Sequence, residues 1–269
     1  MTDPTRPPAT VRRMRILVTN DDGVEAPGLR ALAHALVDAG HDVIVVAPDG
    51  ERSGAGAGIG RLHRSGPIGW TPVEWPELPG VAVHALATLP AAAVYAGSLG
   101  GLGPPPDLVA SGVNRGLNTG HLVLHSGTVG AALTAAVLGL PAVAVSVGWG
   151  DDEHWDTAAA LAADSVPWLA GAPGRVLNLN VPNVPLDEVL GVRAARLAPF
   201  AERWTTETSP GEVVLGYDGH IHEPDDDTDL GVVRAGYASV TLVSGLSGTP
   251  ADDAAAAITV QRAAHAPTG

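Results

Sequence analysis

The sequence of 269 residues contains no cysteine and no lysine. Without cysteine the chain has no disulfide, no thiol nucleophile, no zinc ribbon and no iron–sulfur ligand, and it gives no indication of the redox compartment. Without lysine it has neither a Schiff-base nucleophile nor the lysine of a Walker A phosphate loop. These absences exclude several classes of enzyme before any motif is considered.

Aromatic residues and long apolar runs are also scarce. Only 4% of the chain is aromatic although 45% is hydrophobic, so we expect a globular core of alanine, valine and leucine. The longest apolar stretches, such as residues 142–147, have the length of a strand and fall short of the roughly 18 residues of a membrane span. Residues 1–13 carry charges and prolines but no apolar signal segment, so we expect a disordered tail on a cytoplasmic protein.

Positive charge is limited to 15 arginines, against 29 aspartates and glutamates, which gives a formal net charge of −14 at pH 7. A surface this negative repels phosphate backbones. A nucleic-acid polymer is therefore not an expected partner, and because no segment has the length of a membrane span, a membrane is not expected either.

The N-terminal part of the chain has the pattern of a βαβ unit. Residues 14–19 and 42–47 are short apolar runs typical of buried strands. Between them, residues 26–39 have apolar side chains at helical spacing, with Pro27 in the first turn and Gly40 at the end. A strand, a helix and a strand in this order predict a parallel pair with a right-handed crossover.

The same alternation continues along the chain and predicts an α/β fold with a Rossmann-like, doubly wound and mainly parallel sheet over residues 14–186. After it, residues 187–250 show strands without helices, which predicts a β-rich extension, and residues 251–269 predict a last helix and a tail. The further elements that we expect are strands at 81–85, 107–111, 142–147, 175–179, 213–217 and 237–243, and helices at 91–99, 127–138 and 155–169.

Two adjacent carboxylates, Asp21 and Asp22, follow the first strand. Ligands of an open α/β sheet bind beyond the carboxyl ends of its strands. Like charges this close repel unless a cation or a proton lies between them, and one aspartate would suffice to cap the following helix. The pair therefore favours a hard divalent cation such as Mg²⁺ or Mn²⁺.

Three other segments fall on the same edge. Residues 48–54 form a polar loop that contains Ser53, and residues 111–120 form a loop rich in glycine and asparagine. Ser126, Gly127 and Thr128 open an alanine-rich helix, where free N–H groups and the helix dipole favour an anion. Ser126 is equally suited to be the cap of that helix.

These segments resemble the SurE family of metal-dependent 5′/3′-nucleotidases, also described as survival-protein acid phosphatases. The resemblance covers about residues 14–243 and is carried by NDDG at 20–23, PDLVASGVNRGLNTG at 106–120, HSGTVGAAL at 125–133 and DTDLGVVRAGYASVTLV at 227–243. It implies a Rossmann-like core, a β-hairpin extension used to form a homodimer or homotetramer, and hydrolysis of small phosphate monoesters, nucleoside monophosphates in particular.

The resemblance also implies a site with one divalent cation per subunit. Its metal ligands would be Asp21, Asp22, Ser53 and Asn114. The phosphate would be bound by Ser126, Gly127 and Thr128 of the helix start, together with Asn114 and Asn118. Either Asp21 or Asp22 could serve as the general base, and the sequence leaves that choice open.

The chain departs from the family pattern around this set. Ala92 stands where an aspartate is common, and His121 and His125 stand where aspartate and tyrosine are common. His125 directly precedes the helix start, so it could protonate a leaving alkoxide. For His121 we expect no role in the site.

Three other functions remain open at this point. The substrate could be another small phosphate ester of a particular pathway, or the chain could bind a phosphate ligand without turning it over. A sugar-nucleotide glycosyltransferase has a similar opening but needs two Rossmann domains. A pair at His220 and His222, without a third ligand, predicts an exposed hairpin, and the acidic run 225–229 predicts a solvated turn.

Overall fold

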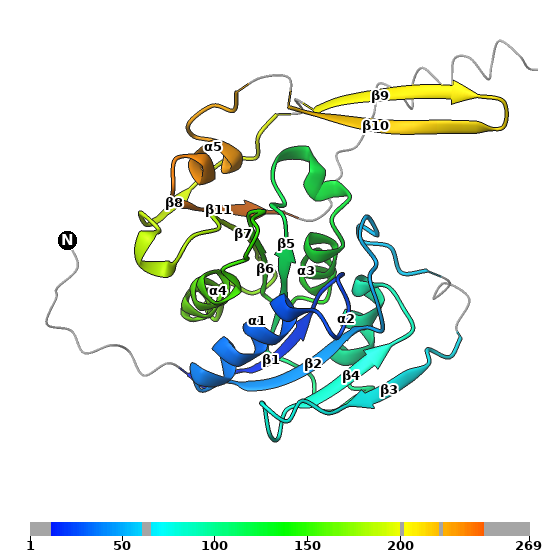
Figure 1. Ribbon diagram of the computed structural model, residues 1–269. Coiled ribbons are helices and arrows are strands. Elements are labelled where there is room, and N and C mark those ends of the chain that lie inside the picture. Colours follow the sequence, from blue (N-terminus) through cyan, green and yellow to red (C-terminus); the bar gives the residue numbers. More distant parts are fainter. Residues whose placement is uncertain (1–11, 61–65, 200–201, 221–222, 245–269) are drawn as a thin grey trace, which may run out of the picture.

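The computed structural model describes residues 12–60, 66–199, 202–220 and 223–244 (Figure 1). The predicted terminal tail up to residue 11 and the helix at 251–264 lie outside the described residues. A central sheet carries helices on both faces, and a two-stranded hairpin projects beyond it (Figure 1).

The central sheet has nine strands in the order β3-β4-β2-β1-β5-β6-β7-β11-β8. The six from β4 to β7 are parallel to their neighbours, whereas β3 and β11 run antiparallel to β4 and β7. The strands are β1 (Arg15–Thr19), β2 (Asp42–Pro48), β3 (Trp70–Val73), β4 (Ala82–Leu86), β5 (Leu108–Arg115), β6 (Ala142–Val147), β7 (Val176–Val181), β8 (Val192–Ala194) and β11 (Ala238–Val243).

Helices α1 and α4 pack on one face of the sheet, and α2 and α3 pack on the other. Strands β2, β6 and β7 are buried almost throughout because both faces are covered, and most of their residues are apolar, with Ser146, Asn178 and Asn180 as buried polar exceptions. The helices are α1 (Pro27–Asp38), α2 (Pro90–Ser98), α3 (Gly127–Val137), α4 (Trp155–Leu169) and α5 (Asp229–Arg234), with short 3-10 turns η2 (Gly120–Leu124) and η3 (Leu186–Glu188).

The predicted doubly wound α/β fold is therefore confirmed. The chain builds outward from β1 to β2 and β4, then crosses back to β5 and builds outward the other way. The point where the strand order reverses lies between β1 and β5, where such folds bind their ligands. Pro27 opens α1, and Gly40 follows its end with a φ of 86°, as predicted.

Strand β3 was not predicted from the sequence. Its four residues are mostly exposed and include Pro72, so they show neither an apolar run nor alternation. Proline is tolerated there because β3 is an edge strand with one partner. Strand β5 extends four residues beyond its predicted end at Ser111, so Asn114 lies on the strand rather than in a loop.

The expected extension over residues 187–250 does not stand apart from the sheet as a whole. β11 pairs with β7 and β8 pairs with β11, so both belong to the central sheet. Of the described part of this range, the hairpin β9 (Glu202–Ser209) and β10 (Glu212–His220) forms a separate two-stranded sheet. An antiparallel strand needs no crossover helix, so the end of the helix–strand alternation did not reveal that the sheet continues.

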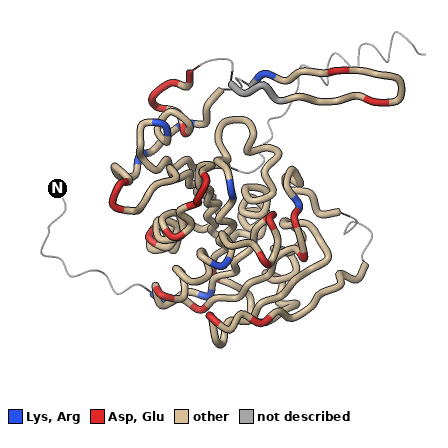
Figure 2. Tube along the Cα trace, viewed as in Figure 1, with Lys and Arg blue, Asp and Glu red and all other residues tan. Residues whose placement is uncertain are grey.

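Acidic residues occur all along the chain trace, with few basic residues between them (Figure 2). In the described residues no helix combines the length and apolarity needed to cross a bilayer.

Candidate functional site

Asp21 and Asp22 lie in a tight turn at the carboxyl end of β1. The buried Asn20 closes this turn, since its Nδ2 donates to the carbonyl of Gly23 at 3.0 Å and its Oδ1 accepts from the N–H of Gly23 at 3.2 Å. Gly23 has a φ of 100°, and a Cβ there would lie 2.9 Å from the backbone of Gly50. Glycine suits this position because it adopts a positive φ readily and has no Cβ to clash with the backbone of Gly50.

The carboxylate of Asp21 faces the start of α3. The Thr128 hydroxyl donates to Asp21 Oδ1, and the backbone N–H groups of Gly127 and Thr128 also donate to this carboxylate. A Cβ at Gly127 would lie 2.7 Å from Asp21 Oδ2, so only glycine fits. The helix start predicted to receive an anion therefore faces a carboxylate of the chain itself.

Ser126 is the cap of α3. Its Oγ accepts from the N–H of Val129 at 3.1 Å. This interaction confirms the capping role and leaves the N–H groups of Gly127 and Thr128 for Asp21.

Asn114 joins the same cluster from β5. Its Oδ1 lies 3.4 Å from the Thr128 hydroxyl, and its Nδ2 donates to the carbonyl of Gly116 at 2.7 Å. The carbonyl oxygen of the side chain is thus turned towards Thr128 and Asp21. Oxygen atoms from the turn after β1, from β5 and from α3 thus meet at the edge of the sheet.

The two carboxylates are electrostatically crowded. Burial, and then the neighbouring charges of Asp21 and Glu51, raise the pKa of Asp22 to about 7, although an N–H of Arg115 donates to it. Burial also raises the pKa of Asp21, which is 3% exposed, against the hydrogen bonds from Thr128 and Gly127. Among the described residues no arginine or histidine forms an ion pair with either group.

Ser53 lies in a loop that packs against the site. The N–H of Arg52 donates to the carbonyl of Asp21 at 2.6 Å, and the N–H of Gly56 donates to the carbonyl of His125 at 3.1 Å. The Ser53 side chain is exposed, and its hydroxyl donates to Glu51 Oε1 at 3.0 Å. The structure therefore brings the Ser53 loop to the site but shows no contact of its hydroxyl with the aspartates.

Asn118 lies in a buried network beneath the site. Its side-chain Nδ2 donates to Ser146 Oγ at 2.8 Å, its N–H donates to Asn180 Oδ1 at 2.8 Å, and its carbonyl accepts from Asn178 and Asn180. These contacts hold the loop after β5 onto β6 and β7. Sequence reasoning missed Ser146, Asn178 and Asn180, although asparagine within an otherwise apolar strand was a visible signal.

The departures from the family pattern occupy different surroundings. Ala92 is buried within α2, whereas the side chains of His121 and His125 are exposed. His125 follows η2 and immediately precedes the α3 cap, Ser126.

The residues that could hold a cation are a mixed set of oxygen donors. In the part of the chain that the structure describes, no three histidine, aspartate or glutamate side chains are grouped for a metal. The paired carboxylates, the Asn114 amide oxygen and a hydroxyl nevertheless supply the hard ligands that Mg²⁺ and Mn²⁺ prefer. The site fits such an ion because its donors are hard oxygen atoms and because its two carboxylates, whose pKa values are raised, have no cationic side chain to neutralise them among the described residues.

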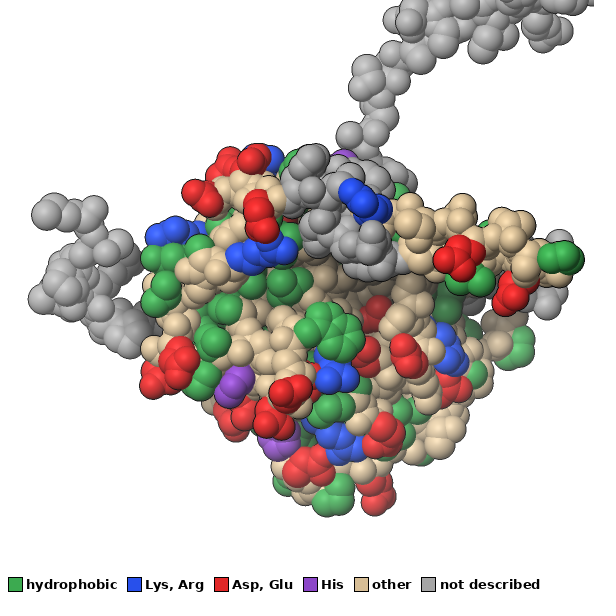
Figure 3. Space-filling model, turned by 45° about the horizontal axis from the view of Figure 1, so that its top comes forward, with side chains coloured by type: hydrophobic (Ala, Val, Ile, Leu, Met, Phe, Trp, Pro, Cys, Tyr) green, Lys and Arg blue, Asp and Glu red, His purple; other side chains and the backbone are tan. Residues whose placement is uncertain are grey.

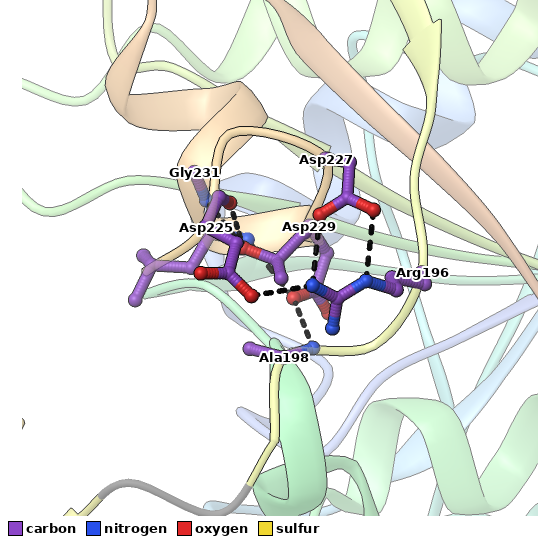
Figure 4. A network of polar contacts seen from close by, with 8 residues as sticks. Arg196, Ala198, Asp225, Asp227, Asp229 and Gly231 are labelled. Carbon is purple, nitrogen blue, oxygen red and sulfur yellow. Dashed lines mark hydrogen bonds and ion pairs between the residues drawn. The ribbon is translucent and has the colours of Figure 1, made fainter. Parts of the chain in front are cut away.

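The acidic run 225–229 is more than the solvated turn expected from the sequence (Figure 4). Arg196 bridges the exposed Asp225 and Asp227 at 2.5 and 2.8 Å. Asp229 is fully buried, and it accepts from the N–H groups of Gly120 at 2.8 Å and Ala198 at 2.9 Å. This carboxylate therefore ties α5 to η2 and to the segment that leads into the hairpin.

Comparisons with known proteins find relatives over most of the chain. The family model of survival protein SurE matches residues 16–204. The 5′/3′-nucleotidase SurE of Erwinia tasmaniensis is 38% identical over 239 residues, with 86% of this chain and 90% of that protein covered. The 5′-nucleotidase SurE of Xanthomonas euvesicatoria is 40% identical over 240 residues, with 86% and 89% covered.

The fold also matches a solved structure. The crystal structure of SurE protein from Aquifex aeolicus superposes with a TM-score of 0.75 at 28% sequence identity, covering 92% of this chain and 99% of that one. This match covers a larger share of the chain than the family model, which spans residues 16–204.

Proposed function

This chain belongs to the SurE family, and from that membership and the site geometry we propose that it is a divalent-metal-dependent phosphomonoesterase that hydrolyses nucleoside monophosphates to nucleoside and phosphate. The observation that carries the proposal is the pair Asp21 and Asp22 at the switch point of the sheet, of which Asp21 faces the start of α3. A predicted cytoplasmic location stays a prediction.

In this proposal Asp21, Asp22, Ser53 and Asn114 hold one Mg²⁺ or Mn²⁺ per subunit. When bound there, such a cation would polarise the phosphoryl oxygens and lower the pKa of a bound water. It would also relieve the repulsion between the two carboxylates. Burial raises the pKa of Asp21, and burial followed by the charges of Asp21 and Glu51 raises the pKa of Asp22.

The other residues of the site bind and orient the substrate. Ser126, Gly127 and Thr128, with Asn114, bind the phosphate, which requires that the donors of Gly127 and Thr128 release Asp21 to the cation. The α3 dipole adds positive potential to an acidic surface. Asn118 supports this loop from below. An aspartate of the pair accepts a proton, and the exposed His125 donates one to the leaving alkoxide.

Phosphate release from a panel of monoesters, with and without Mn²⁺, tests the proposal. We expect activity on nucleoside monophosphates that disappears with excess chelator and returns with Mn²⁺ or Mg²⁺. Asp21→Asn should lower the rate by about 100-fold or more, the scale of losing a positioned acid or base. Asp38→Asn, at the exposed end of α1, is the matched control and should keep full activity.

Full turnover in excess EDTA would contradict the role of the metal. Turnover of other phosphate esters in preference to nucleotides would instead identify the chain as a phosphatase of another pathway. Tight phosphate binding without any turnover would leave a binding protein.

A further inference from the structure

Trp149 is an exposed aromatic residue at the edge of the sheet that carries the site. It lies two residues beyond the end of β6, which neighbours β5, and its side chain is 70% exposed. Exposing a large apolar side chain to water is unfavourable in free energy. An exposed one beside a site is therefore a candidate for a contact with the ligand. Acidic side chains are spread over the face shown in Figure 3, with a few basic ones between them.

The ring of Trp149 is held by the last residue of β5 and by the glycine that follows it. A Cβ at Gly116 would lie 2.5 Å from Trp149 Nε1, so the indole rests directly on the Gly116 backbone. The Arg115 guanidinium lies 4.8 Å from the centroid of the Trp149 ring, within the range of a cation–π interaction. Arg115 is in turn fixed by an ion pair with Glu153.

The same dipeptide connects Trp149 to the proposed metal ligands. The backbone N–H of Arg115 donates to the Asp22 carboxylate, and the carbonyl of Gly116 accepts from the Asn114 side chain. Arg115 and Gly116 therefore contact both the two site residues and the indole. The ring position is consequently set by the same strand end that sets Asp22 and Asn114.

Resting on the proposed function, we propose that Trp149 is a substrate-specificity residue that stacks on the base of a nucleoside monophosphate. A supported indole with most of its surface open offers a planar apolar surface, and every nucleobase has a π-face to place on it. The contact adds affinity for the base and takes no part in phosphate chemistry. Purines, with the larger ring system, should gain more than pyrimidines.

The test compares AMP with ribose 5-phosphate, which has the same phosphate ester but no base. We expect Trp149→Ala to lower kcat/KM for AMP by about 5- to 100-fold, mainly through KM, the range for loss of one base–aromatic stack. For ribose 5-phosphate the value should change less than about 2-fold. Trp149→Phe should restore most of the preference for AMP.

Trp168→Ala is the matched control. Trp168 is also exposed, but it lies in the last turn of α4, beside Leu177 at the opposite edge of the sheet. This variant should treat both esters as the parent does. An equal loss on both esters in Trp149→Ala, or no loss on either, would overturn the stacking role.

Calorimetric titration with AMP in the presence of Mn²⁺ separates this inference from the proposed function. If the parent turns over neither ester, the proposed function fails. AMP binding that weakens in Trp149→Ala but not in Trp168→Ala would then still support the stacking role. AMP binding that is unchanged in Trp149→Ala would refute it.

Discussion

At the scale of single residues, the central feature is two neighbouring carboxylates that lack a cationic side-chain partner among the described residues. Thr128 and Gly127 satisfy Asp21 by hydrogen bonds, whereas Asp22 keeps a pKa of about 7. A pair in this state is poised to exchange a proton for a metal ion, because both compete for the same oxygens.

We therefore predict that stabilisation by Mn²⁺ grows as the pH rises from about 5.5 to about 8. Folding raises the pKa of Asp22 from 3.8 to about 7. Between these two values the metal-free folded state holds a proton that the unfolded chain has lost. Its stability then falls as the pH rises towards 7, and above 7 the cation no longer has to displace the proton. Differential scanning fluorimetry with and without Mn²⁺ measures the shift in Tm.

Asp22→Asn removes the titrating group and is the control for this prediction. Its shift in Tm on adding Mn²⁺ should be smaller and nearly independent of pH. A shift in the parent that is equal at both pH values would show that Asp22 does not bind the cation.

At the scale of elements, Asp229 connects three segments that are far apart in the sequence (Figure 4). It stands at the start of α5 and accepts from Gly120 in η2 and from Ala198 before the hairpin. Because η2 leads into the α3 cap, the carboxylate also supports the segment that carries His125 and Ser126.

Asp229→Asn should lower the free energy of unfolding by about 1–3 kcal/mol. The amide replaces one acceptor oxygen by an N–H donor, which leaves a buried backbone N–H of Gly120 or Ala198 without a partner. Urea denaturation gives the change. The control is Asp226→Asn, an exposed neighbour in the same run, which should alter the value by less than about 0.5 kcal/mol. Equal effects of the two variants would argue against a supporting role for Asp229.

At the scale of the whole molecule, the edges of the central sheet are short and protected. β3 has four residues including a proline, and β8 has three residues. The hairpin β9–β10 instead projects from the body, and a two-stranded sheet has little stability alone in water. Its exposed apolar side chains include Trp204, Val213, Val214 and Leu215.

We predict that the hairpin forms the contact of a homodimer or homotetramer. Leu215→Asp places a charge in this apolar surface and should shift the protein towards monomer at micromolar concentration, as measured by light scattering. Val137→Asp, at the exposed end of α3, is the control and should leave the assembly intact. A parent protein that is monomeric throughout the micromolar range would contradict the predicted assembly.

Sequence patterns alone determined the core of this protein. Apolar runs and helical spacing are local, so they predicted β1, β2, β6 and the helices α1 to α4 to within a few residues, and the parallel order followed from their alternation. Asp21 and Asp22 could be assigned to the functional edge for the same reason, since a residue that follows a parallel strand has only one edge to occupy.

Which distant groups meet depends on the tertiary structure. The pairing of β11 with β7, the hydrogen bonds from α3 to Asp21, the burial of Asp229 and the position of Asn118 all join segments far apart in the chain. No local pattern encodes such partners, because strand pairing and buried hydrogen bonds depend on where other elements come to lie. The same holds for Trp149, whose place beside the site depends on how the end of β5 contacts the loop after β6.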